Sequence, residues 1–314
     1  MKMNRKDRSF PDYIVLGVKG FCMGASDVIP GVSGGTMAFI LGIYEELIDA
    51  IKSFDLKSLQ SLVTLKFRSL LDRISWQFLL AVGMGILAAI FTLSRLLSWL
   101  LQNRPVFIWS FFLGLILASV LSVSRRVEAW RSLTGLCLVG GTLGSYFLVG
   151  LVPVSTPNDY WFLFLCGAVA ICAMILPGIS GSYILVLLGK YRYVLDAVNH
   201  RDFFVLGLVA AGAVVGIIAF SRLLGWLLKN HHDLMVATLT GLMIGSLRKV
   251  WPWKETLKST IDLHGQMTPL VQSNILPGQW NGEVLAALSL MVTGLFAVLL
   301  LDRLGNRNGR RSSP

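Results

Sequence analysis

The chain has 314 residues, of which 54% are hydrophobic and only 14% are charged, with a formal net charge of +11. A soluble domain of ordinary composition carries about a quarter charged residues, so this composition excludes that class and indicates a membrane protein. The excess lysine and arginine lies in short loops and at both ends, as in "MKMNRKDR" and "DRLGNRNGRRSSP". Basic loops beside apolar segments indicate orientation and attraction to membrane phospholipids, so we expect no nucleic-acid partner.

The apolar segments are continuous, and most are close to the roughly 20 residues that a membrane-spanning helix needs. In chain order they are Phe78–Leu101, Val106–Val123, Leu133–Val152, Phe203–Leu228 and Val284–Leu301. A shorter segment, Leu234–Leu247, spans only if Arg248 and Lys249 snorkel to the interface. Strands are not expected, because the segments do not alternate between apolar and polar residues. The pattern predicts an all-α polytopic membrane protein.

Two phrases of the chain are nearly the same. "VIPGVSGGTMAFILGIYEELIDAI", from Val28, aligns without gaps with "ILPGISGSYILVLLGKYRYVLDAV", from Ile175, at an offset of 147 residues. Further along, "SRLLSWLL" from Ser94 matches "SRLLGWLL" from Ser221 at an offset of 127 residues. Two matches in the same order indicate a duplicated unit.

The duplication divides the chain into a first repeat, 1–152, and a second repeat, 153–314. Each repeat has one segment broken by glycine and proline, followed by three ordinary spans. If the broken segment crosses the membrane once, the repeats are parallel. If it enters and returns as a re-entrant hairpin, over about residues 11–50 and 161–198, the repeats are inverted.

Loop charges favour the inverted arrangement. The N-terminus and the loop after Ile51 are both basic, so the positive-inside rule places both in the cytoplasm, and this requires the hairpin. The C-terminus is then also cytoplasmic. One basic loop, Arg248–Pro277, disagrees, because this topology places it outside.

Each repeated phrase contains a Pro-Gly-x-Ser-Gly break. The break residues are Pro30, Gly31, Pro177 and Gly178. Proline and glycine interrupt a helix, so we expect a new half-helix after each break, with serine as its N-cap. Helix N-termini at membrane depth suit an anion. The predicted anion-binding residues are Ser33, Gly34, Gly35 and Thr36 in the first repeat, and Ser180, Gly181 and Ser182 in the second. The alternative is that these glycines only permit close helix packing.

Two groups of charged residues inside or beside the spans are also candidates. Arg95 and Arg222 are matched between the repeats; a charge inside a span costs about 2.5–3.5 kcal/mol, and arginine suits bidentate contact with phosphate. The alternative is that both snorkel to the interface. Asp27, Glu45 and Glu46 are candidates for ion coupling, although Asp27 can instead pair with Lys19 or an arginine.

Enzyme hypotheses have little support. The chain has no nucleotide-binding glycine-lysine loop and no metal-ligand spacing, so we expect no cofactor and no metal. A membrane lipid phosphatase needs a histidine nucleophile beside basic residues and a carboxylate, and the single candidate cluster is His231, His232 and Asp233.

The phrase "GASDVIPGVSGGTMAFILGIYEELI" and its echo "LPGISGSYILVLLGKY" resemble the paired signatures of the bacterial PopT-type polyprenyl-phosphate transporters. This resemblance covers nearly the whole chain. It implies a multi-pass protein of the cytoplasmic (inner) membrane that returns undecaprenyl phosphate from the outer to the inner leaflet, for reuse in peptidoglycan synthesis. The phosphate would then bind the anion-binding residues and pass between the two arginines. An oligomer is compatible with the sequence. The alternative functions are a secondary transporter of a small soluble anion and a membrane scaffold.

Overall fold

The computed structural model describes residues 8–28, 33–54, 75–261 and 267–311. The helices, in chain order, are α1 (Phe10–Asp27), α2 (Gly34–Ile40), α3 (Tyr44–Lys52), α6 (Trp76–Asn103), α7 (Pro105–Ser124), α8 (Ser132–Leu148), α9 (Tyr160–Ile175), α10 (Gly181–Leu187), α11 (Tyr191–Asn199), α12 (Phe203–Asn230), α13 (His232–Val250) and α14 (Gly282–Arg311). The strands β1 (Lys254–Ile261) and β2 (Met267–Asn274) form one antiparallel hairpin.

The structure is that of a helical membrane protein. In the described part of the chain, four helices are long and apolar enough to cross a membrane: Trp76–Asn103, Pro105–Ser124, Phe203–Asn230 and Gly282–Leu300. The other two predicted spans are also helical. However, α8 ends at Leu148, short of the predicted Val152, and α13 is not among the four.

The prediction of a purely helical protein is wrong for the hairpin β1–β2, which lies in the polar segment after α13. The expectation of no strands follows from the apolar segments, and this segment is polar. Outside the hydrocarbon core, a backbone can leave an edge to water, so a two-stranded hairpin is permitted there.

Helices of the two repeats pair with one another at matched glycines. Gly114 of α7 lies against the backbone of Met291 in α14, and the matched Gly241 of α13 lies against Leu138 in α8. Within each repeat, Gly20 of α1 lies against the backbone of Val82 in α6; the same contact recurs between α9 and α12. Because glycine has no Cβ, the backbones approach closely, as is typical of helix pairs in membranes.

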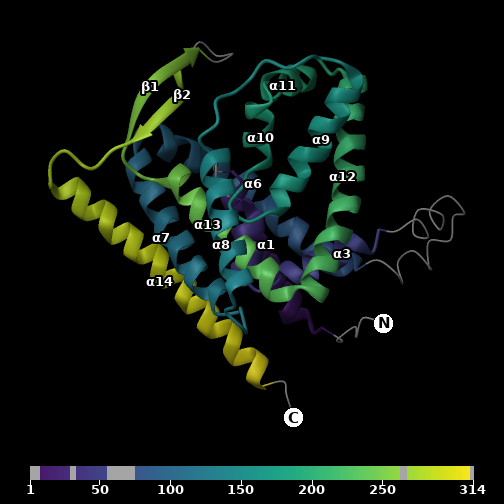
Figure 1. Cartoon of the computed structure of the whole chain (residues 1–314), viewed down its shortest axis with the longest axis vertical. Helices are drawn as coiled ribbons and strands as arrows, with labels where there is room; N and C mark the ends of the chain where they lie inside the picture. The colour runs from purple at the N-terminus through teal and green to yellow at the C-terminus, as the bar shows by residue number, and fades with distance from the viewer. Residues whose placement is uncertain (1–7, 29–32, 55–74, 262–266, 312–314) are drawn as a thin grey trace, which may run out of the picture.

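The chain doubles back between α1 and α6. Helices α1 and α6 run parallel, since Gly20 meets Val82 and Gly24 meets Ile86, so the chain between them returns to the end from which α1 started. The start of α1 and the end of α14 lie at the same end of the molecule as α3, whereas α11 and the β-hairpin lie at the opposite end (Figure 1).

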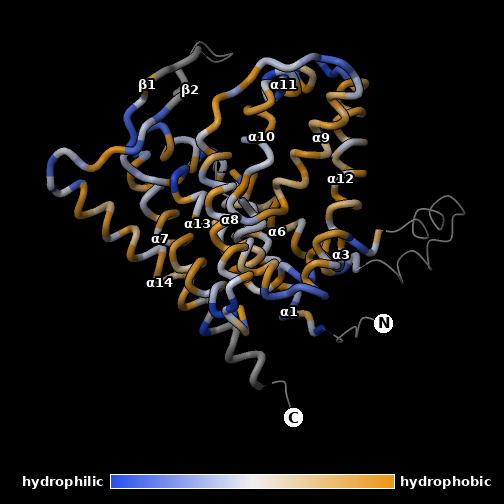
Figure 2. The backbone as a smooth tube through the Cα atoms, in the orientation of Figure 1, coloured by the Kyte–Doolittle hydropathy of each residue, from blue (hydrophilic) through white to orange (hydrophobic). Residues whose placement is uncertain are grey.

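Apolar residues line the lengths of the helices, and polar residues gather at the two ends (Figure 2). Large apolar side chains face outward, including Phe91 on α6, which is 81% exposed, and Leu285 on α14, which is 71% exposed. A surface this apolar is typical of a protein whose surroundings are lipid rather than water. The polar contacts described next lie between these helices.

Candidate functional site

The two breaks, 28–33 in the first repeat and 176–180 in the second, are joined by hydrogen bonds. The hydroxyl of Ser33 donates to the carbonyl of Met174 over 2.9 Å. In the other direction, the backbone N–H of Gly178 donates to Oγ1 of Thr36, also over 2.9 Å. The hydroxyl of Tyr44, which is buried, donates to the carbonyl of Ile175 over 3.3 Å. These hydrogen bonds join Ser33 and Thr36 of the first repeat to Met174 and Gly178 of the second. None of the three involves the predicted anion-binding residues of the second repeat.

At the first break, the N–H groups of α2 are already engaged. Oδ1 of Asp27 accepts from the N–H of Gly34 over 2.7 Å, and Oγ of Ser33 accepts from the N–H of Gly35 over 3.1 Å. The prediction that Ser33 is an N-cap is confirmed. Asp27 therefore occupies the position that an external anion would take at this helix end.

The second break differs in its chemistry. Ser180 stands at the N-cap of α10, as predicted, but its side chain makes no capping hydrogen bond. Its Oγ instead lies 2.8 Å from Oγ of Ser182, which is exposed. Met174 stands where the first repeat has Asp27, and it supplies no carboxylate to compete for the helix end. The described serines at the start of α10 are thus more accessible than the matching residues of α2, because Ser180 is half-buried and Ser182 exposed whereas Ser33 and Gly35 are buried.

The backbone of the second break follows its sequence. Leu176 is extended, with φ −69° and ψ 130°, as expected before Pro177. Gly178 has φ +87°, a left-handed conformation that favours glycine. The matching break residues Pro30 and Gly31 lie outside the described residues.

The turn that follows α2 and the matching turn that follows α10 each accept a hydrogen bond from a polar side chain. The ammonium of Lys19 donates to the carbonyl of Leu41 over 2.8 Å, and the hydroxyl of Thr156 donates to the matching carbonyl of Leu188. Lys19 is therefore engaged with backbone, and the structure gives no ion pair between it and Asp27. A second lysine was missed by the sequence reasoning. Lys190 is only 2% exposed and donates to the carbonyl of Thr156 over 2.7 Å.

The two matched arginines lie on the outer surfaces of their helices. Arg95 of α6 and Arg222 of α12 are exposed, and each is followed one turn later by an exposed tryptophan, Trp99 or Trp226. In the described part of the chain, neither guanidinium is joined to the breaks by a hydrogen bond or ion pair.

The two glutamates predicted for ion coupling lie at the start of α3. Glu46 forms a bidentate ion pair with Arg8, with both N–O distances at 2.7 Å. Oε1 of Glu45 lies 3.8 Å from Nε2 of His232. Both are far along the chain from their partners, so these contacts hold α3 against other elements at this end of the molecule.

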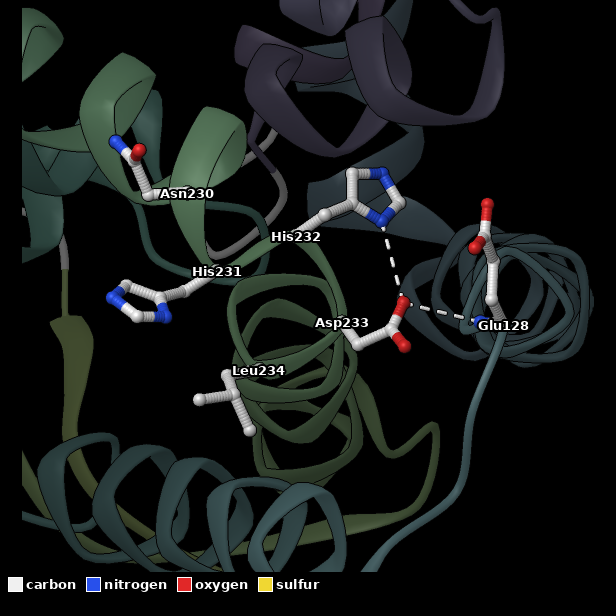
Figure 3. Close-up of a pocket in the computed structure, with 6 residues that line it drawn as sticks. All are labelled: Glu128, Asn230, His231, His232, Asp233 and Leu234. Atoms are coloured by element: carbon white, nitrogen blue, oxygen red, sulfur yellow. Dashed lines mark hydrogen bonds and ion pairs between the residues drawn. The ribbon is translucent and has the colours of Figure 1, made fainter.

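The histidine cluster lines a pocket of about 310 Å³ at the junction of α12 and α13 (Figure 3). There, the carboxylate of Asp233 accepts from the backbone N–H groups of Glu128 and Ala129, over 3.1 and 3.0 Å. Nδ1 of His232 lies 3.4 Å from Oδ1 of Asp233. The hydrogen bonds of Asp233 therefore attach the start of α13 to the loop that follows α7. This structural role explains why the three residues are grouped.

Fold and site together define a polytopic membrane protein with two glycine-rich breaks joined by hydrogen bonds. Residues 23–268 match the family described as undecaprenyl phosphate translocase-like, and the chain belongs to this family. It is 41% identical over 298 residues to the polyprenyl-phosphate transporter of Vibrio cholerae, covering 93% of this chain and 97% of that protein. It is 32% identical over 254 residues to the polyprenyl-phosphate transporter of Staphylococcus aureus, covering 75% and 85%. No solved structure matches. These relatives are named as transporters, which fits the expectation that the chain is not an enzyme.

Proposed function

We propose that the chain transports polyprenyl phosphate, specifically undecaprenyl phosphate, from the outer to the inner leaflet of the bacterial cytoplasmic membrane. There the lipid carrier would be reused for peptidoglycan synthesis. The observation that carries this proposal is the contact between the two breaks, where the Ser33 hydroxyl donates to the carbonyl of Met174 and the Thr36 hydroxyl accepts from the N–H of Gly178. The names of both relatives support the choice of substrate.

The proposed arrangement in the membrane is a pair of inverted repeats, 1–152 and 153–314, each beginning with a re-entrant hairpin. It is supported by the parallel pairing of α1 with α6 and by the contact between Arg8, before α1, and Glu46, in α3. It is also supported by the separation of α3 and α11 to opposite ends (Figure 1). Both termini are then cytoplasmic, and the breaks place irregular backbone at membrane depth, which is tolerated where it is buried in protein or lines a water-filled cavity.

In this mechanism the phosphate head uses Ser180, Gly181 and Ser182 first, because the serines of that break are the more accessible. At the first break, the proposed residues are Ser33, Gly34, Gly35 and Thr36, and the N–H of Gly34 becomes available only when Asp27 releases it. Since a carboxylate and a phosphate compete for the same donors, protonation of Asp27 would favour phosphate binding and couple transport to an ion gradient. The long apolar tail stays in lipid.

Arg95 and Arg222 are proposed to hold the phosphate at the two membrane surfaces, before and after passage through the breaks. Their exposure beside tryptophans is typical of residues at the headgroup level. A guanidinium can bind a phosphate through two parallel hydrogen bonds. One arginine in each leaflet would therefore bind the phosphate head before it crosses the membrane and again after it has crossed.

The test is lipid binding by the purified protein, measured by native mass spectrometry. Undecaprenyl phosphate, undecaprenol and a phospholipid are compared for the wild type and for the Arg95→Gln/Arg222→Gln variant. We expect preference for the phosphate form, weakened in the variant, because each lost charged contact reduces the affinity. Equal binding of undecaprenol and undecaprenyl phosphate by the wild type would contradict the proposal and favour a transporter of small soluble anions.

A further inference from the structure

Three cationic side chains gather where α13 ends and β1 begins: Arg248, Lys249 and Lys254. We name them the cationic cluster. In the described part of the chain, no carboxylate oxygen lies within ion-pair distance of any of the three. Uncompensated cations that are partly withdrawn from water are costly, so their grouping needs a reason.

Aromatic rings surround the two lysines. Nζ of Lys254 lies 4.4 Å from the ring centroid of Trp109 in α7, and Nζ of Lys249 lies 5.0 Å from that of Tyr183 in α10. The ammonium of Lys254 also donates to the carbonyl of Lys249, so the two lysines are neighbours. Both side chains are half-buried. Rings of this kind hold a cation in place and leave its remaining N–H donors free for an anion.

The cationic cluster is connected to the second break. Tyr183 directly follows Ser182, and its hydroxyl donates to the carbonyls of Leu148 and Leu151 over 3.3 Å. An added Cβ at Gly178 would lie 2.9 Å from the carbonyl oxygen of Leu242 in α13, the helix that ends in the cluster. The same helix thus supports both the break and the lysines.

Helix-end electrostatics accounts for part of the cluster. Cations in the last turn of a helix are favourable by about 0.3–1 kcal/mol. Arg248 and Lys249 lie in the last turn of α13, and Lys254, beyond the helix, donates to the carbonyl of Lys249 in that turn. Nη1 of Arg248 also donates to the carbonyl of Tyr146 in α8 over 3.2 Å. A helix end does not explain three cations that have no carboxylate partner among the described residues, and burial together with the neighbouring Lys249 lowers the pKa of Lys254 to about 7.

The position of the cluster is informative. It lies at the end of the molecule that holds α11 and the β-hairpin, opposite the end of α14 (Figure 1). In the proposed orientation this is the outer surface, where the positive-inside rule disfavours lysine and arginine. A ligand that carries negative charge explains why this loop departs from the rule.

We propose that Lys249 and Lys254 form a binding site that captures the phosphate head of the lipid at the outer membrane surface and delivers it to the second break. The inference rests on the proposed function and adds a loading site to it. The ligand chemistry is a phosphate monoester at the end of an apolar chain.

The test compares three variants of the purified protein by native mass spectrometry, with undecaprenyl phosphate and undecaprenol as probes. Lys249→Gln/Lys254→Gln should bind the phosphate form at least about tenfold more weakly, with undecaprenol unchanged. Lys249→Arg/Lys254→Arg keeps both charges and should retain most of the binding. Lys229→Gln removes an exposed lysine in the last turn of α12, outside the cationic cluster, and this variant should bind the phosphate form like the wild type.

A second measurement on the unaltered chain avoids the effect of substitution on folding. A membrane-impermeant amine reagent is applied with and without undecaprenyl phosphate, and the labelling of Lys254 is quantified by peptide mass spectrometry. The phosphate lipid should protect Lys254, and undecaprenol should not. If the wild type prefers the phosphate lipid but neither the glutamine variant nor the protection responds, the loading site is wrong while the transport proposal stands. If the wild type shows no preference, both fail.

Discussion

At the scale of single residues, Asp27 is the most informative side chain. Its carboxylate accepts from the N–H of Gly34 and thereby fills the helix end that we propose for the phosphate. The second repeat has Met174 at this position, so duplication alone does not explain Asp27. A carboxylate at one break only gives the two breaks different affinities for an anion.

Replacing Asp27 with asparagine tests its proposed role in coupling. Asparagine keeps an oxygen acceptor for Gly34, so the fold should survive, but it removes the charge that competes with phosphate. We expect undecaprenyl phosphate to bind at least as tightly as to the wild type, while gradient-dependent transport falls at least about tenfold. Asp159→Asn, at an exposed position before α9, is the control. Unchanged transport with the same dependence on the gradient would remove Asp27 from the mechanism.

A second residue-scale prediction concerns Thr36, which is only 1% exposed. Thr36→Val leaves the N–H of Gly178 without its acceptor, which should lower the free energy of unfolding by about 1–3 kcal/mol. Thermal unfolding in detergent measures this as a lower midpoint. Thr92→Val is the matched control, because Thr92 is exposed and donates only within its own helix. Equal midpoints for the two variants would show that the hydrogen bond between the breaks contributes nothing.

At the scale of elements, the close approach of α2 to the end of α9 depends on Gly35. An added Cβ would lie 2.5 Å from the carbonyl oxygen of Ile175, a rigid backbone atom. We expect Gly35→Ala to separate the breaks, at a cost of about 1–3 kcal/mol, and to abolish transport. At Gly83 an added Cβ meets nothing within 4 Å, so Gly83→Ala should be neutral or stabilising. Transport by the Gly35 variant at the wild-type rate would contradict the proposed path.

The packing of the two hairpins is asymmetric. Helix α2 is buried throughout, whereas the matching helix α10 is only partly buried. Helix α3 packs on α12, but the matching helices α11 and α6 have no comparable contact in the described residues. In a protein built from two similar repeats, we interpret this as one of two access states, closed at the end that holds α3.

A cross-link between α3 and α12 tests this interpretation. An added Cβ at Gly225 would lie 2.7 Å from Cδ of Lys52, so a short thiol cross-linker that is cleaved by reduction can span Lys52→Cys and Gly225→Cys in a chain without its four native cysteines. We expect cross-linking to stop transport and reduction to restore it. The controls are the single variants Lys52→Cys and Gly225→Cys, which carry the same substitutions and cannot form the cross-link. If the cross-link leaves transport unchanged, the closed end does not open.

At the scale of the whole molecule, the two repeats are interlocked. Helix α7 of the first repeat packs on α14 of the second, and α8 packs on α13. Neither repeat can bury these faces alone. We therefore expect residues 1–152 and 153–314, expressed separately, to be degraded, and expressed together to recover a folded, lipid-binding complex. Stable, lipid-binding single halves would contradict this view.

Much of this architecture could be predicted from the sequence, because membrane helices are long and apolar and the breaks contain proline and glycine. The capping by Ser33 followed from local chemistry. The hydrogen bond from Gly34 to Asp27 could not be predicted, since the two residues are seven positions apart and only the fold brings them together. The burial of Lys190 and the grouping of Lys249 with Lys254 depend on loops that only the fold brings together. The β-hairpin could not be found from apolar segments, because it lies in a polar part of the chain.

The most direct test of the central claim is transport in proteoliposomes that hold the purified chain and undecaprenyl phosphate in one leaflet. The arrival of the phosphate head in the opposite leaflet is followed with an enzyme or reagent confined to that side. We predict faster transfer than in protein-free liposomes, no acceleration of a phospholipid, and loss of the effect in the folded Gly35→Ala variant. Transfer no faster than in protein-free liposomes, with the wild-type chain folded and correctly inserted, would contradict the account.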